Sequence, residues 1–338
     1  MSVSLVNHIL KQHGINHFGF TPLKRPLSID IYKDWLKKNH HANMKYLEEH
    51  SEQKEFPQLL APQARHAIVW TTPYPCKPNN YPLRELKIAK YALGDDYHYW
   101  LKNKANSLCH DLKTLFPNET FVGFTDSSPV LERDLAYRAG LGWIGKNSCL
   151  ISRKQGSYFL IAEIYTSLDI TSSLPTSPDH CGTCNLCVDS CPTQALLDNR
   201  TLDAHKCISY WTIESKTPPP KELADQFSGW FFGCDICQDV CPWNQKIYKP
   251  ISPPPPQRPQ IIAELRWILK ASHKELERTF QTTPLLRARG KGLKKNALIV
   301  AANLNLVELT PDILPFLNHP HLSELAQWTM QRLKPHFQ

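Results

Sequence analysis

The chain has 338 residues, which is enough for two or three domains of ordinary size. Hydrophobic residues make up 41% and charged residues 21%, a balance that is typical of globular proteins and excludes collagen-like fibres, coiled-coil rods and long disordered tails. The formal charge of +8 is too small for a histone-like binder of nucleic acid, but it allows a local anion-binding surface.

Residues 1–170 alternate between helical and extended patterns, which predicts one mixed α/β domain built in layers. The predicted helices are Val3–His13, Leu86–Leu115 with a break near Gly94, and Leu131–Ala139. The predicted strands are His17–Thr21, Ala67–Thr72, Thr120–Phe124 and Tyr158–Tyr165.

Two linkers follow this region. Residues 171–178 are rich in Ser, Thr and Pro, and residues 250–259 contain four consecutive prolines, so we expect a domain boundary at each. Residues 258–338 show a pattern of paired helices and contain 12 Lys and Arg against 6 Asp and Glu. We therefore predict an α/β domain at 1–170, a cysteine-rich module at 171–250 and a basic helical tail at 251–338.

The beginning of the chain lacks the features of a signal peptide, and no window approaches the roughly 18 apolar residues of a membrane span. We therefore expect a cytoplasmic protein that has no contact with a membrane. We also expect a monomer. In a reducing compartment, clustered cysteines indicate metal or redox chemistry more often than disulfides.

Eight of the eleven cysteines lie in one segment, and their spacing is that of a bacterial ferredoxin. Cys181–Pro192 reads C-x2-C-x2-C-x3-C-P, and a second run that ends in Cys-Pro lacks one cysteine, which Cys207 can supply. In such a module the cysteine before each proline reaches the neighbouring cluster. The predicted ligands are Cys181, Cys184, Cys187 and Cys241 for the first [4Fe–4S] cluster, and Cys191, Cys207, Cys234 and Cys237 for the second.

A structural zinc site is the alternative, but zinc sites use two well-separated cysteine pairs, and this spacing does not fit them. The remaining cysteines, Cys76, Cys109 and Cys149, have no partner motif and are expected to be ordinary reduced thiols.

Several strings in the first 250 residues resemble the epoxyqueuosine reductase family, and they occur in order with the ferredoxin run in its place. The basic tail resembles a shortened form of the HEAT-like C-terminal module of some members. The matching strings are Tyr91–His98, Phe124–Arg133, Ala139–Asn147, Lys206–Tyr210 and Phe232–Gln238.

The resemblance implies an enzyme that binds cobalamin in the base-off form, as cob(II)alamin, and feeds it electrons through two [4Fe–4S] clusters. The implied reaction reduces the epoxide of epoxyqueuosine at the wobble position of tRNA to queuosine, the last step of queuosine synthesis. The implied partners are the tRNAs for Asp, Asn, His and Tyr and an external one-electron reductant. Composition and spacing alone do not indicate cobalamin, because the D-x-H-x-x-G motif of histidine-ligated corrinoid proteins is absent.

An epoxide oxygen leaves readily only if it is protonated, so the reaction needs a proton donor. The resemblance implies that this donor is Asp126. The alternative is that Asp126 caps the helix after Pro129. Asp134 is expected to be a solvated surface charge, and Glu132 and Arg133 are expected to form local ion pairs.

The resemblance also implies a set of cobalamin contacts. Lys54 lies at a position, just before a Leu-Leu-x-Pro motif, where the family often has arginine. Lysine keeps the positive charge but lacks the planar guanidinium group of arginine. Lys146 is alternatively a surface lysine, and Asp235 is alternatively the cap of a local turn. The implied contacts are Lys54, Lys146, Leu150, Ser157, Ile161, Ser209, Cys234 and Asp235.

A tRNA substrate requires phosphate contacts and space for an unstacked base. The predicted phosphate contacts lie in one basic stretch, for which a solvated helix start is the alternative. They are Arg287, Arg289, Lys291, Lys294 and Lys295.

Two other functions remain open at this point. A reductive dehalogenase also joins a cobalamin domain to two clusters, but such enzymes usually carry a twin-arginine signal, which this sequence lacks. An electron carrier without enzymatic activity would need neither the basic tail nor the motif-rich α/β half.

Overall fold

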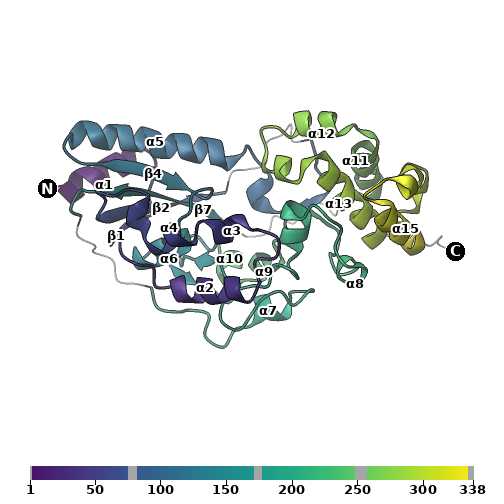
Figure 1. The fold of residues 1–338 in the computed structure, drawn as a ribbon, viewed down its shortest axis with the longest axis horizontal. Coiled ribbons are helices and arrows are strands. Elements are labelled where there is room, and N and C mark those ends of the chain that lie inside the picture. The colour runs from purple at the N-terminus through teal and green to yellow at the C-terminus, as the bar shows by residue number, and fades with distance from the viewer. Residues whose placement is uncertain (1, 75–81, 171–176, 248–256, 334–338) are drawn as a thin grey trace.

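The computed structural model describes residues 2–74, 82–170, 177–247 and 257–333. The α/β half lies at one end of the molecule and the helical tail at the other, and the cysteine-rich segment packs against both (Figure 1). Cys76 and most of both predicted linkers lie outside the described residues; Arg258 and Pro259 of the second linker form the first turn of a tail helix.

The α/β half contains a four-stranded sheet in the order β1-β2-β7-β4, and every neighbouring pair is antiparallel. All four predicted strands are confirmed. The strands are β1 (Phe18–Pro22), β2 (His66–Pro73), β4 (Phe121–Thr125) and β7 (Phe159–Thr166).

Helices cover both faces of this sheet (Figure 1). The helices α1 (Ser2–Gln12) and α5 (Tyr97–Leu115) pack on one face, and α6 (Glu132–Arg138) packs on the other. Because strand side chains alternate between faces, Ala162 and Ile164 of β7 join the first core and Ile161 and Tyr165 join the second.

The predicted helix Leu86–Leu115 is wrong in its first third. Lys87–Ile88 forms a short strand, β3, which pairs with β8 (Trp230–Phe232), and a 3₁₀ turn follows at Lys90–Ala92. The helix α5 begins only after Asp96, whose side chain accepts a hydrogen bond from a backbone N–H of the first turn. The apolar residues before it pack into the core of the tail, so tertiary contacts override the helical pattern.

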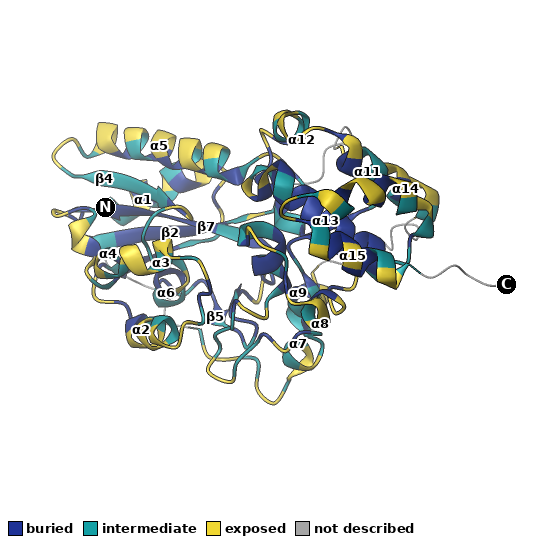
Figure 2. Cartoon of the chain, turned by 45° about the vertical axis from the view of Figure 1, so that its right-hand side comes forward, coloured by how far each residue is buried: buried dark blue, intermediate teal, exposed yellow. Residues whose placement is uncertain are grey.

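The helical tail is confirmed as a series of helices, and it shares one hydrophobic core with residues of the cysteine-rich segment and of the α/β half. Figure 2 shows its central helix, α13 (Arg289–Asn303), buried along most of its length. The other tail helices are α11 (Arg258–Lys270), α12 (His273–Thr279), α14 (Thr310–Ile313) and α15 (Ser323–Arg332). The tail therefore docks on the rest of the chain rather than forming a core of its own.

Shorter elements complete the fold. The strands are β5 (Trp143–Ile144) and β6 (Leu150–Ile151); the helices are α2 (Ile29–Lys37), α3 (Tyr46–Glu49), α4 (Ser51–Glu55), α7 (Leu186–Asp189), α8 (Lys221–Ala224), α9 (Ile236–Asp239) and α10 (Pro242–Gln245). A π-helical turn covers Tyr210–Glu214, and further 3₁₀ turns cover Pro57–Leu59, Pro284–Ala288, Val307–Leu309 and Leu314–Asn318. Within the described ranges, no helix has both the length and the apolar character needed to cross a membrane.

Candidate active site

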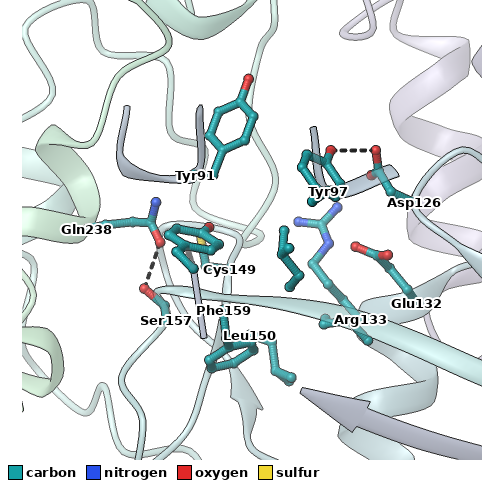
Figure 3. Close-up of a pocket in the computed structure, with 13 residues that line it drawn as sticks. Tyr91, Tyr97, Asp126, Glu132, Arg133, Cys149, Leu150, Ser157, Phe159 and Gln238 are labelled. Atoms are coloured by element: carbon teal, nitrogen blue, oxygen red, sulfur yellow. Dashed lines mark hydrogen bonds between the residues drawn. The ribbon is translucent and has the colours of Figure 1, made fainter. Parts of the chain in front are cut away.

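A cavity of about 310 Å³ lies at the end of the sheet where β2 and β4 end and β7 begins. Its floor is apolar, and its polar lining includes side chains of α5 and α6, of the loops next to β2, β4 and β7, and of the cysteine-rich segment (Figure 3). The lining residues are Tyr74, Tyr91, Tyr97, Asp126, Glu132, Arg133, Cys149, Leu150, Ser157, Phe159, Leu160, Ile161 and Gln238.

Asp126 lines this cavity and is held by two side chains from the start of α5. Tyr97 donates its hydroxyl to Oδ2 of Asp126 at 2.7 Å, and His98 Nε2 lies 2.9 Å from the same oxygen. The other ring nitrogen of His98 lies 2.6 Å from Asp96. The alternative role of Asp126 as a helix cap is wrong, because Leu131 precedes α6 and no side chain caps that helix.

This network sets the charges of Asp126 and His98. Burial alone would raise the pKa of Asp126, but the hydrogen bonds from His98 and Tyr97 outweigh it, and the pKa lies below its usual value. The bond to Asp126 raises the pKa of His98 despite burial, and Asp96 adds to this effect. The network therefore favours a carboxylate on Asp126 and an imidazolium on His98.

Glu132 is a second acid in the cavity. Burial and the nearby charge of Asp126 raise the pKa of Glu132 to about 8, against the opposing charge of Arg133. Neither Glu132 nor Arg133 forms the expected local ion pairs within the described structure. Arg133 instead donates to the backbone oxygen of Ser148 and, at 2.9 Å, to its hydroxyl.

The expectation that Asp134 is a solvated charge is wrong. Its side chain is buried and accepts a hydrogen bond from Arg138 Nε at 2.6 Å and one from the backbone N–H of Ser28 at 2.9 Å. Arg138 also donates to the carbonyl oxygen of Pro22. This pair ties α6 to the chain around β1, and it has a structural role.

Three of the implied cobalamin contacts, Leu150, Ser157 and Ile161, line the cavity. Ser157 also joins the α/β half to the cysteine-rich segment. It donates its hydroxyl to Gln238 at 2.8 Å, accepts one hydrogen bond from Asn244 and gives its backbone N–H to the same residue. Gly156, with φ +65°, is required before it, because a Cβ there would lie 2.1 Å from the Asn244 side chain.

Lys54 and Lys146 do not line the cavity. Lys54 is buried on α4, where burial lowers the pKa of its amine, and its Nζ lies 5.5 Å from the centre of the Tyr32 ring. Lys146 donates to Asn185 of the first cysteine run at 2.7 Å.

Ser209, Cys234 and Asp235 lie within the cysteine-rich segment and outside the cavity lining. Asp235 is buried and accepts a hydrogen bond from the backbone N–H of Lys90 at 2.7 Å, while burial raises the pKa of its carboxyl to about 6. It precedes α9 but makes no cap bond to that helix, so the alternative role as a local cap is wrong.

Among the eight clustered cysteines, the electrostatic interactions run within the two predicted sets of four, and the assignment of each set to a cluster stays a prediction. Burial raises the pKa of several of these thiols, and within each set neighbouring thiols raise it further. Cys241 interacts with Cys181 and Cys184, and Cys191 interacts with Cys207 and Cys234. Among the described residues, no three His, Cys, Asp or Glu side chains converge like the ligands of one metal ion.

Cys149 connects the cysteine sets to the cavity. Burial raises the pKa of its thiol to about 11, and its electrostatic neighbours include Cys187 and Cys241 of one set and Cys237 of the other. Cys149 itself lines the cavity that holds Asp126, so the cavity lies within electrostatic range of both sets.

The prediction that Lys294 and Lys295 contact phosphate is wrong for this structure. Their side chains lie inside the tail, with exposures of 8% and 2% for the two residues. Lys294 donates to the carbonyl oxygen of Leu269, and Lys295 donates to those of Trp211 and Ser215. Burial lowers the pKa of the Lys295 amine to about 7.

Arg287 and Arg289 are exposed and Lys291 is half-buried. Arg287 makes a bidentate ion pair with Glu214 at 2.9 and 2.8 Å, and its charge lowers the pKa of Asp126, so it lies near the cavity. Lys216 is exposed and interacts electrostatically with Arg287 and Arg289. The sequence analysis did not predict this residue, because the residues next to it form no basic cluster.

Sequence reasoning also missed the roles of Tyr97, His98, Glu132 and Gln238. The signal for Tyr97 and His98 was present, because both lie in one of the strings that carry the family resemblance. Gln238 also lies in such a string, but its contact with Ser157, which joins residues 81 positions apart, was not recognisable.

Comparisons with known proteins agree with this geometry. Residues 180–244 match the family model of the 4Fe-4S double cluster binding domain, and residues 55–127 match that of epoxyqueuosine reductase QueG, DUF1730. The segment with the cysteine sets is therefore an iron–sulfur domain.

Relatives match over most of the chain. The chain is 40% identical over 273 residues to an epoxyqueuosine reductase of Cellulophaga algicola, covering 78% of this chain and 85% of that protein. It is 36% identical over 326 residues to one of Francisella cf. novicida, covering 90% and 89%.

Solved structures share the fold. The epoxyqueuosine reductase of Streptococcus thermophilus superposes with a TM-score of 0.85 at 28% identity, covering 99% of this chain and 92% of that one. An epoxyqueuosine reductase crystallised with a modified tRNA stem loop, 24% identical, has the same fold, with a TM-score of 0.84 and the same coverage. By its sequence and its architecture, the chain belongs to the epoxyqueuosine reductase family and is an oxidoreductase.

Proposed function

We propose that this chain reduces the epoxide of epoxyqueuosine in tRNA to the alkene of queuosine, with electrons relayed through two [4Fe–4S] clusters to cobalamin. The observation that carries the proposal is one cavity lined both by Asp126, with its hydrogen-bonded His98, and by Cys149, whose electrostatic neighbours include cysteines of both sets. One small space thus joins a source of protons to a source of electrons.

The residues of the cavity suit a corrinoid. Leu150, Leu160 and Ile161 form an apolar floor on which the face of a macrocycle can pack. Arg133, Ser157 and Gln238 place polar groups around that floor for the amide side chains of the ring. A bound corrinoid would supply a strongly reducing metal centre, and the two cysteine sets would hold the clusters that reduce it.

The protein's own residues handle the proton. His98 carries it on Nε2, in the hydrogen bond to Asp126 Oδ2, and Asp96 orients the ring through Nδ1. When an epoxide oxygen lies against Asp126, transfer of this proton to Asp126 and then to the oxygen protonates the leaving group. Tyr97 holds the carboxyl in place by its hydrogen bond.

The tRNA is proposed to bind over the HEAT-like tail beside the cavity mouth. Lys216, Arg287, Arg289 and Lys291 form the basic surface, and exposed Tyr46, 5.7 Å from the Arg287 guanidinium, offers a ring for stacking an unstacked base. The polyanionic substrate and the reduced thiols suit a reaction in the cytoplasm.

The test of the reaction uses anaerobic protein loaded with iron, sulfide and cobalamin, a one-electron reductant and epoxyqueuosine tRNA. Nucleoside mass spectrometry should show the loss of one oxygen atom. Product from an aryl halide, with none from tRNA, would support the dehalogenase instead.

The proposed tRNA surface has its own test. Arg289→Ala should reduce the slope of log affinity against log salt by about one unit, because each phosphate contact releases counterions. Lys294→Met is the matched control, since its amine faces the protein interior. Equal slopes for Arg289→Ala and the wild type would remove Arg289 from the interface.

A further inference from the structure

The proposed reaction needs two protons in the same cavity. Reduction of the epoxide breaks both C–O bonds, forms the second bond of the alkene and forms two O–H bonds, so that the oxygen leaves as water. Two electrons enter from the external one-electron reductant. The Asp126–His98 pair holds one proton in its hydrogen bond, which leaves one proton without a source.

Glu132 occupies the position from which a second proton could come. It is the first residue of α6, it lines the cavity, and its carboxyl lies on the same side of the cavity as that of Asp126 (Figure 3). Within the described part of the chain, its oxygens form no hydrogen bond or ion pair. A carboxyl group without a fixed partner is available to a ligand in the cavity.

The surroundings of Glu132 keep it protonated at neutral pH. The charged and titratable groups that face it are Asp126 after β4, Tyr97 of α5, Glu163 of β7 and Arg133 of α6. Only Arg133 favours the charged form, and burial together with Asp126 outweighs it. Glu163 is fully buried with both oxygens unpaired, and burial raises its pKa far above the usual value, so it stays neutral.

We propose that Glu132 is the second proton donor of the epoxide reduction. This inference rests on the proposed function. The Asp126–His98 pair supplies one proton to the oxygen and Glu132 supplies the other, so that water departs and Glu132 is left as a carboxylate. Solvent reprotonates it once the product has left the cavity.

The kinetic test compares Glu132→Gln with Glu163→Gln, the same change at a buried glutamate that does not line the cavity. Glu132→Gln should lower kcat about 100-fold with little change in the KM for tRNA, and the alkaline limb of the wild-type pH profile, near pH 8, should disappear. Glu132→Asp should recover part of the rate, and Glu163→Gln should keep the limb. A wild-type rate and limb in Glu132→Gln, or loss of the limb in Glu163→Gln, would overturn the proposal.

Infrared difference spectroscopy gives a readout that does not depend on turnover. Wild type and Glu163→Gln should lose a neutral carboxyl band as the pH rises through about 8, and Glu132→Gln should lack that band. The same band in Glu132→Gln would refute Glu132 as the acid. Wild-type protein that shows the band but makes no queuosine would refute the proposed reaction and the donor role with it, while the cavity acid would stand.

Discussion

The two faces of the central sheet are built from the same strands but filled differently. The face under α1 and α5, the apolar face, buries mainly apolar side chains, such as Leu10, Leu108 and Ile164. The face under α6, the acidic face, includes Glu163 and the Asp134–Arg138 pair beside its apolar residues. The cavity with Asp126 and Glu132 opens at the end of the sheet next to this second face.

This difference separates stability from chemistry. The apolar face contributes the free energy of burial without any charge to neutralise. The acidic face excludes water from charged groups, which shifts their pKa values and fixes their positions. We therefore expect substitutions on the first face to change unfolding, and those around the cavity to change turnover.

The largest expected effect is on turnover at the cavity. Asp126→Asn keeps the size of the side chain but cannot pass on a proton, so kcat should fall about 10²- to 10⁴-fold. Iron content and thermal unfolding should match those of the wild type. A wild-type kcat in Asp126→Asn would show that the cavity residues do not control turnover as we propose.

The next effect is on the buried ion pair. Asp134→Ala leaves Arg138 buried without its carboxylate, which should cost about 3–5 kcal/mol of unfolding free energy in denaturant titration. The double variant Asp134→Ala/Arg138→Leu should recover part of the loss, because no charge stays buried. An unchanged midpoint in the single variant would mean that the acidic face does not depend on the pair.

On the apolar face, Leu108→Ala removes a fully buried side chain of α5 and should cost about 2–4 kcal/mol in the same titration. The kcat of the folded fraction should stay within about twofold of the wild type. Leu115→Ala, at an exposed position of the same helix, is the matched control and should change little. A large loss of kcat in Leu108→Ala would show that the two faces are not separate.

The smallest effect concerns the pH dependence of stability. The folded pKa of His98 is raised, so its bond to Asp126 stabilises the protein below the unfolded histidine value of about 6.5, and this contribution is lost as the pH rises through the folded pKa. Asp126 has a lowered pKa, so the contribution also fades in strong acid.

His98→Gln should therefore unfold more easily than the wild type near pH 5–6, by less than about 1 kcal/mol because His98 is partly exposed. The difference should shrink as the pH rises into the alkaline range. A difference that grows with pH would contradict the charge assignment.

Local patterns predicted much of the fold. Four short strands, and α1 and α6 with helical spacing, lie close to their predicted places. The cysteine spacing placed residues as distant as Cys184 and Cys241 in one predicted ligand set, because the order of ferredoxin ligands follows from their spacing along the chain. The helix predicted from Leu86 failed, because β3 pairs with β8 across more than 140 residues.

The site was predicted less completely, because its chemistry depends on burial. Lys294 and Lys295 read as phosphate ligands, yet tail packing turns both amines towards backbone oxygens. Asp134 and Glu132 are two residues apart on one short helix, and only the fold shows that the first is neutralised by Arg138 and the second faces a cavity.

The amino-acid sequence by itself determined the family and the strands and predicted the cysteine sets, since these depend on residue order and spacing along the chain. The tertiary structure alone decided which carboxyl groups are charged and which hold a proton. The physical reason is that a pKa depends on the water and charges around a group, and those are set by residues far away in the chain.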